Sequence, residues 1–230
     1  MLLCALHTPA SRKYSMSSPA KSKRKKRYVE RPDVRQKLLD AAEAVVREEG
    51  YAAATVRRIA KRAGMTHQAV FYYFGSQDEM LLALLRRSSE SYNSRLIEAL
   101  NSATPLRGLW NLVSDQDATR LGLEFMAFAN HNESVRVEIA SNAKKIRALE
   151  AKAIEKHLTA RGIEPRLSPE LVSILTNALA RLLVQEATLG VLDGHEEAEA
   201  LVDESLRNFE SWGEANAEVE PIVGAMASPD

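Results

Sequence analysis

The side chains that most often perform chemistry are few and scattered in this sequence. None of the five histidines stands at a metal-ligand spacing from a cysteine or a carboxylate. Asp193 and His195, beside Glu196 and Glu197, mimic an acid–base cluster, but acids near a helix start are better explained by the helix dipole. No nucleophile elbow, phosphate loop or dinucleotide-binding glycine turn occurs. The sequence therefore predicts no enzyme, no metal site and no cofactor. The histidines are His7, His67, His131, His157 and His195.

Charge is distributed unevenly along the 230 residues, although the formal net charge is zero. Residues 1–87 carry 18 Lys+Arg and 8 Asp+Glu, a net charge of +10, and the remainder carries −10. A basic segment attracts nucleic-acid phosphates and releases counterions, whereas an acidic segment is repelled by the same duplex. We therefore expect the front of the chain to bind nucleic acid and the rear to perform another task.

The densest basic block is KSKRKKR at residues 21–27, and a stretch rich in Ser, Pro and Ala precedes it. This composition predicts a disordered basic arm over residues 1–30, with Lys25 and Arg27 as phosphate contacts. A nuclear localisation signal, or a charged segment that only increases solubility, would also fit such a block. Translation from Met16 would keep the block and remove Cys4.

Two further features indicate a cytoplasmic protein. The single cysteine, Cys4, allows no internal disulfide. No apolar run approaches the length of a membrane span, and the opening residues lack the basic region of a signal peptide. We therefore expect neither export nor a membrane partner.

Apolar residues recur at helical spacing through most of the chain, and no convincing β alternation occurs, which predicts an all-α fold. Two short helices flank Gly64, which is typical of a helix-turn-helix. Thr55 and Thr66 are expected to cap these helices, and Ser76 and Glu79 form a capping box that begins a long fourth helix. The predicted helices cover residues 33–49, 55–63, 66–74, 77 onward, 106–113, 117–129, 133–161, 169–191 and about 198–212.

The helix predicted over residues 169–191 is apolar around most of its circumference, so it must be covered on two sides. The last helix carries an apolar stripe opposite an acidic face. We predict that both helices bury one side on their own core and the other on a second copy, in a two-fold dimer. Two internal helices of a monomer are the alternative. The polar ladder of the first of these helices consists of Ser173, Asn177, Arg181 and Gln185, and the stripe of the second includes Ala198, Leu201, Val202, Phe209 and Trp212.

Residues 38–85 resemble the N-terminal DNA-binding domain of the TetR family of bacterial transcriptional regulators. They share the Gly-Tyr turn after the first helix, the Thr-Val-Arg-x-Ile-Ala segment, the Ala-Gly turn and the aromatic run that ends the third helix. The resemblance implies a homodimer with a three-helix DNA-binding domain followed by a helical ligand-binding and dimerisation domain. The expected parts are the arm at 1–30, the DNA-binding domain at 31–87, the effector-binding and dimerisation domain at 88–213 and a flexible tail at 214–230.

The resemblance also implies which side chains meet DNA. Its recognition helix is Thr66–Tyr73, whose first residues face base edges in the major groove. Gln68 suits adenine, His67 suits a purine acceptor, and the methyl of Ala69 suits thymine. Without the resemblance, a pair of tyrosines at a helix end would more often be packing residues. The implied DNA contacts are Arg57, Thr66, His67, Gln68, Ala69, Tyr72, Tyr73 and Gln77.

Two positions depart from the family's pattern. Phe71 stands where a Tyr is usual, and Gln77 stands where a Lys is usual, so both changes remove a phosphate partner. Backbone N–H groups at the helix start around Gln77 can still bind a phosphate. We hypothesise that the basic arm replaces the lost charge.

The acidic rear contains apolar and aromatic residues that could line a ligand pocket with a few polar anchors, or that could simply fill a helical core. A largely apolar effector bound there would move the long fourth helix and change the separation of the two recognition helices. The pocket candidates are Trp110, Phe125, Met126, Phe128, His131 and Asn177, followed by Leu109, Leu123, Asn130, Ile139, Leu183 and Gln185.

These features together predict a dimeric regulator that binds a palindromic DNA operator and is released by an unknown small-molecule effector. A repressor is favoured over an activator, although no residue indicates the sign. A ligand-independent architectural DNA-binding protein, with a basic front but little sequence preference, is the other alternative.

Overall fold

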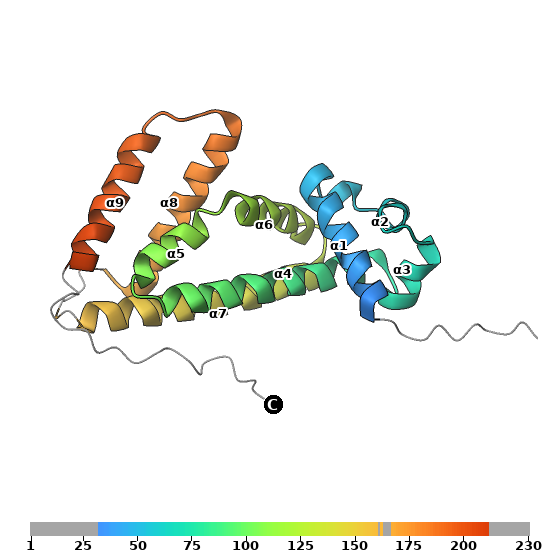
Figure 1. Cartoon of the computed structure of the whole chain (residues 1–230), viewed down its shortest axis with the longest axis horizontal. Coiled ribbons are helices and arrows are strands. Elements are labelled where there is room, and N and C mark those ends of the chain that lie inside the picture. The colour runs from blue at the N-terminus through green and yellow to red at the C-terminus, as the bar shows by residue number, and fades with distance from the viewer. Residues whose placement is uncertain (1–31, 161, 163–166, 212–230) are drawn as a thin grey trace, which may run out of the picture. The chain divides into compact units, whose positions relative to one another are not determined.

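The computed structural model describes residues 32–160, 162 and 167–211, and every regular element in these ranges is helical. The chain forms the helices labelled in Figure 1, so the all-α prediction is confirmed. The predicted basic arm, including Lys25 and Arg27, and the predicted tail at 214–230 lie outside the described residues. The elements are α1 (Pro32–Glu49), the 3₁₀ turn η1 (Tyr51–Ala53), α2 (Val56–Arg62), α3 (His67–Phe74), α4 (Gln77–Leu100), α5 (Pro105–Val113), α6 (Gln116–Ala129), α7 (Glu133–Ala160), α8 (Pro169–Leu189) and α9 (His195–Ser211).

Local capping explains most of the helix starts. The side chains of Thr55, Ser76 and Ser168 each accept a hydrogen bond from the backbone N–H three residues later. Asp115 does the same for Ala118 at 2.9 Å, which starts α6 one residue earlier than expected. The expected cap at Thr66 is wrong in one respect: its backbone is extended, but its side chain makes no capping hydrogen bond.

The core of the predicted DNA-binding domain is formed by α1, α2, α3 and the first half of α4. Helix α6 belongs to the same core, although we expected a domain boundary near residue 87. Its Phe128 ring stacks on Tyr51 of η1 with the ring centroids 5.6 Å apart. The packing of the front of the chain is therefore completed by a helix from the rear. Buried members of this core include Leu38, Val45, Ile59, Val70, Met80, Leu84, Leu121, Phe125 and Phe128.

A second core lies in the body, where α4, α5, α7 and α8 meet. Gly108 of α5 lies directly against the backbone of Ala99 in α4, and a Cβ atom at Gly108 would stand 3.0 Å from the Ala99 carbonyl oxygen. Only glycine allows this approach. The two helices thus pack closely at the C-terminal part of α4. The buried residues of this core are Leu96, Leu100, Leu109, Leu112, Val113, Leu149, Ala153 and Ala180.

Helix α8 turns the first half of its polar ladder inward, whereas Arg181 is exposed. Ser173 and Asn177 are buried, and both bond to Glu150 of α7. Four leucines of α8 are exposed, and those at its two ends, Leu171 and Leu189, are 39% and 78% exposed, whereas Leu183 is buried. This arrangement leaves an apolar stripe of α8 facing away from the chain's own core.

Candidate nucleic-acid interface

The helix-turn-helix consists of α2 and α3, joined by a turn at Gly64, where φ is 67°. The N–H of Met65 donates to the carbonyl oxygen of Ala60 at 2.8 Å and closes this turn. Val70 anchors α3 because its side chain is completely buried in the core. One side of α3, the predicted recognition helix, therefore packs on the core through Val70, and the other side faces solvent.

The first turn of α3 is the exposed one. Thr66, His67 and Gln68 are exposed, so their side chains are accessible to base edges. Ala69 is half-buried and packs on the core, which leaves less of its methyl group for a thymine contact. The three predicted polar contacts thus lie together, and the fourth residue is shared between the core and the surface.

The aromatic end of α3 is divided between packing and solvent. Phe71 and Tyr72 are 50% and 49% exposed, whereas Tyr73 is half-buried and packs on the core. The rings of Tyr72 and Tyr73 meet edge to face, with their centroids 5.0 Å apart. The exposed face of Phe71 is an apolar surface beside the recognition residues, at a position where the resemblance suggested only a lost hydroxyl.

Two of the three arginines in α2 are neutralised by α1. Arg58 pairs with Glu49, and Arg62 pairs with Glu48 at 2.5 Å. The bond from Arg62 lowers the pKa of Glu48, so this acid stays ionised beside the interface. Arg57 is exposed and takes part in no ion pair among the described residues. It is the α2 arginine whose charge remains for a phosphate.

Gln77 has a role that sequence analysis missed. Its Oε1 accepts a hydrogen bond from the N–H of Val56 at 3.3 Å, so the first residue of α4 caps the first residue of α2. The lysine usual in the family could not accept this bond, because an ammonium group has no acceptor. Gln77 therefore positions the two helix starts relative to each other.

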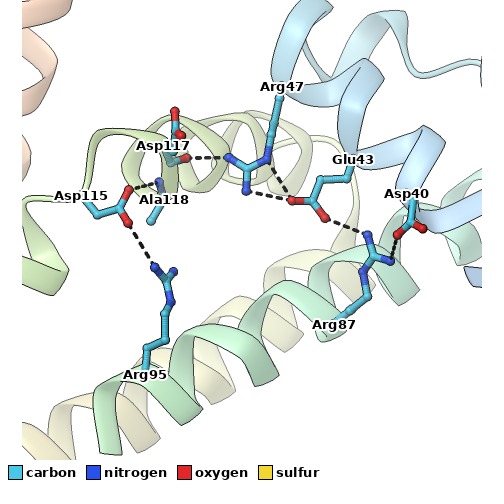
Figure 2. Close-up of polar contacts among 8 residues, drawn as sticks. All are labelled: Asp40, Glu43, Arg47, Arg87, Arg95, Asp115, Asp117 and Ala118. Carbon is cyan, nitrogen blue, oxygen red and sulfur yellow. Dashed lines mark hydrogen bonds and ion pairs between the residues drawn. The ribbon is translucent and has the colours of Figure 1, made fainter. Parts of the chain in front are cut away.

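A network of charged groups connects α1 with α4 and α6 (Figure 2). Arg87 of α4 donates to Asp40 at 2.6 Å and to Glu43 at 2.7 Å, and both acids belong to α1. Arg47 of α1 donates to Glu43 at 2.9 Å and to the backbone carbonyl of Asp117 in α6 at 3.0 Å. The DNA-binding helices are therefore bonded to two elements that continue into the body.

Helix α6 is attached at two further points. Asp115 accepts from Arg95 of α4 at 3.1 Å, and Glu124 accepts from the backbone N–H of Tyr51 at 2.8 Å. The N–H of Ala118 lowers the pKa of Asp115, and Arg95 lowers it further, against the effect of burial. Because Gly50 has a φ of 85° and a Cβ there would lie 3.2 Å from Glu124 Oε2, this corner is built around glycine.

The six principal pocket candidates are not brought together. Phe125 and Phe128 belong to the core of the DNA-binding domain, and Trp110 packs on the second core. Met126, at 51%, and His131 are exposed. Asn177 alone of the six is buried in contact with a charged group of the body. The aromatic residues of α6 were candidates by composition only, and packing uses them to join the two halves of the chain.

Neither a metal cluster nor a membrane span occurs in the part of the chain that the structure describes. No group of three or more His, Cys, Asp or Glu residues within these ranges could hold a metal ion. None of the helices described here is both long enough and apolar enough to cross a bilayer.

Comparisons with known proteins agree with this geometry. The family described as "Bacterial regulatory proteins, tetR family" matches residues 38–84. The chain is 33% identical to the HTH-type transcriptional repressor AcnR of Corynebacterium efficiens over 48% of its own length and 66% of that relative. It is 29% identical to the HTH-type transcriptional regulator BetI of Rhizobium meliloti, over 51% of this chain and 62% of that protein. These alignments span just under two thirds of the curated relatives.

Solved structures share the fold over a larger part of the chain. A TetR transcription regulator from Haloarcula marismortui superposes with a TM-score of 0.62 at 23% identity, covering 78% of this chain and 97% of that one. A putative transcriptional regulator from Saccharomonospora viridis, in complex with choline, gives 0.63 at 19% identity, with coverage of 79% and 96%. Residues 38–84 therefore match the tetR family of bacterial regulatory proteins, and most of the chain shares its fold with solved regulators.

Proposed function

We propose that this chain acts in the cytoplasm as a dimeric transcriptional regulator that binds a palindromic DNA operator and is released by a small-molecule effector. The observation that carries the proposal is the exposed first turn of α3, within a helix-turn-helix that matches the family. The relatives include repressors and also an activator, FasR of Mycolicibacterium smegmatis, which is 35% identical over 39% of this chain and 41% of that protein. Occlusion of a promoter by a bound dimer is the action that we favour.

The exposed stripe of α8 supports the dimer. Leu171, Leu175, Ala178, Leu182 and Leu189 follow one another at intervals of four, three, four and seven residues, which places them on one face of the helix. All five are exposed. An apolar surface of this kind indicates an interface. A second copy that supplies the same stripe would cover it and give the two-fold symmetry of a palindromic operator.

The bonds of Figure 2 suggest how an effector would act on DNA binding. Helix α4 contributes to the second core and α6 packs against α7 and α8, and both α4 and α6 are bonded to α1. A body conformation that moves either helix would therefore move α1 and the recognition helix with it. An effector needs only a different affinity for the two conformations to shift the population.

Ligands of two neighbours by fold are consistent with a small-molecule effector. The Saccharomonospora viridis regulator was solved with choline, and FadR of Bacillus subtilis was solved with stearoyl-CoA. These two ligands differ widely in size and polarity, so the fold alone does not define the effector of this chain.

The experiment that tests the proposal is selection of bound duplexes from a random pool at physiological salt. Enrichment of one palindrome is expected, and Gln68→Ala should weaken or alter that enrichment. Gln116→Ala is the matched control because Gln116 is exposed on α6, away from α3. Salt-sensitive binding without an enriched site would favour the architectural alternative and contradict the proposal.

A further inference from the structure

Glu150 of α7 is a completely buried carboxylate in the body. One of its oxygens, Oε2, accepts hydrogen bonds from Ser173 Oγ and from Asn177 Nδ2, the latter at 2.9 Å. The other oxygen, Oε1, is buried and has no hydrogen-bond partner among the residues that the structure describes. No Lys, Arg or His among the described residues forms an ion pair with Glu150. A charged oxygen in this position is costly unless a donor reaches it.

A second buried polar atom that lacks a hydrogen bond within the described residues lies one helical turn from Glu150. Nη1 of Arg147, also on α7, is buried and has no hydrogen-bond partner within the described ranges of the chain. Residues three apart on a helix are neighbours on its surface. The charge of Arg147 favours the ionised form of Glu150, yet the two side chains form no ion pair. A buried acceptor and a buried donor of opposite charge thus stand close together, each without a partner.

Polar side chains from three helices, α4, α7 and α8, surround Glu150. Tyr92 of α4 interacts with its charge, and burial together with that charge raises the pKa of Tyr92 to about 12. The phenol therefore stays neutral. Burial raises the pKa of Glu150, while the bonds from Ser173 and Asn177 and the charges of Arg147 and Arg181 act in the opposite direction. The side chains of α4, α7 and α8 converge here beside the second core.

We propose that Glu150 and Arg147 are the anchors of the effector, and that the effector is a small zwitterion of the α-amino acid class. Its ammonium group donates to Glu150 Oε1, and its carboxylate accepts from Arg147 Nη1. Such a molecule carries both charges two bonds apart on one carbon, which suits a donor and an acceptor one helical turn apart. An apolar side chain would face the second core, against which Tyr92 packs.

This inference rests on the proposed function, because it identifies the class of effector for the same regulator. The proposal also gives a role to Asn177, which alone among the buried pocket candidates contacts a charged group. Its amide donates a hydrogen bond to Glu150 Oε2, so Oε1 remains for the ammonium group of the effector. Ser173 and Asn177 come from α8, so an effector at Glu150 would also bear on the helix that carries the exposed stripe.

The test measures binding of each of the twenty standard amino acids to the full chain by thermal shift and calorimetry, with the decarboxylated amine and the deaminated acid of any that bind. At least one amino acid should raise Tm and release DNA, and its amine and acid should each bind at least about tenfold more weakly. Failure of all twenty to shift Tm would overturn the proposal and leave water as the partner of both atoms.

Two variants with matched controls make the assignment specific. Glu150→Gln and Arg147→Gln should each weaken amino acid binding by about tenfold or more, whereas Glu155→Gln and Lys152→Gln, at exposed positions of the same helix, should not. Unchanged affinity in Glu150→Gln would contradict the proposal. DNA binding by each variant without amino acid is measured in parallel, so a fault in folding or in the DNA-binding function is recognised separately.

Discussion

The charged groups of the DNA-binding domain and of the body are arranged in different ways. Around α1, arginines and acids pair near the surface, and Arg87 joins two carboxylates. In the body, Glu150 is buried with one oxygen unmet, and leucines of α8 face outward. Charged groups that pair at the surface need no further molecule to satisfy them. Buried polar atoms without hydrogen bonds, and exposed leucines, would be stabilised by contact with another molecule. This difference is what we expect if the front binds DNA without rearrangement and if the body binds the proposed second copy and effector.

The largest expected effect concerns the exposed stripe of α8. Leu182→Glu places a charge on a surface that we propose to be buried between two copies. The dimer should dissociate, and operator affinity should fall at least about 100-fold because a monomer holds one half-site only. Analytical ultracentrifugation and DNA titration measure both effects. Thr188→Glu, at an exposed position off the stripe, is the control. A dimeric Leu182→Glu protein would show that the interface lies elsewhere.

The next prediction concerns the charge of the front. Removal of residues 1–30 deletes the block at residues 21–27 and should lower operator affinity and flatten its dependence on salt, by about 0.9 in logarithmic slope for each phosphate that the arm no longer binds. Gln77→Lys in the shortened chain should restore binding to about one phosphate, although it removes the hydrogen bond from the N–H of Val56. Fluorescence anisotropy at several salt concentrations measures the slope. An unchanged slope after deletion would remove the arm from the interface.

A smaller effect is expected at the bonds between α1 and α4. Arg87→Met breaks the bonds to Asp40 and Glu43 and should lower the free energy of unfolding by about 1 kcal/mol, or roughly 2–4 °C in Tm. Arg86→Met is the neighbouring control, since Arg86 makes one bond, to Glu138, and is more exposed. Equal Tm values for the two variants would show that the bonds from Arg87 to Asp40 and Glu43, drawn in Figure 2, do not stabilise the packing of α4 on α1.

The smallest effect is a pH dependence at α6. Asp115 has a lowered pKa in the folded chain, so its contribution to stability is present above its unfolded pKa of about 3.9 and is lost as pH falls through the folded pKa. Asp115→Asn should therefore be less stable than the wild type at pH 6, and the difference should shrink below about pH 4. Denaturant unfolding at a series of pH values checks this. A difference independent of pH would assign the effect to packing rather than to charge.

Much of the fold could be predicted from the sequence because its signals are local. Apolar spacing and capping residues such as Ser76 and Ser168 act within one or two turns, and the helices begin and end within a few residues of expectation. Gly190 ends α8 at Leu189 through a left-handed φ of 77°, two residues before the predicted end. The recognition helix was placed by the resemblance, and its first turn is exposed as expected.

The parts that could not be predicted depend on tertiary contacts. Helical periodicity shows that Phe125 and Phe128 share a face, but not that this face completes the core around α1. The capping of α2 by Gln77 joins residues 21 positions apart. For α8, the sequence predicted a helix covered on two sides but did not show which residues face the chain's own core. Ser173 and Asn177 are buried there with Leu183 because they donate hydrogen bonds to the buried carboxylate of Glu150.

Base recognition by α3 is tested most directly by comparing base preference in the wild type and in Gln68→Ala. Each base pair of the selected operator is varied in turn, and the affinity of both proteins is measured at one salt concentration. We predict that the variant loses discrimination, by about 1–3 kcal/mol, at one base pair in each half-site and retains it elsewhere. A uniform loss of affinity at every sequence, with all preferences kept, would contradict base recognition by the first turn of α3.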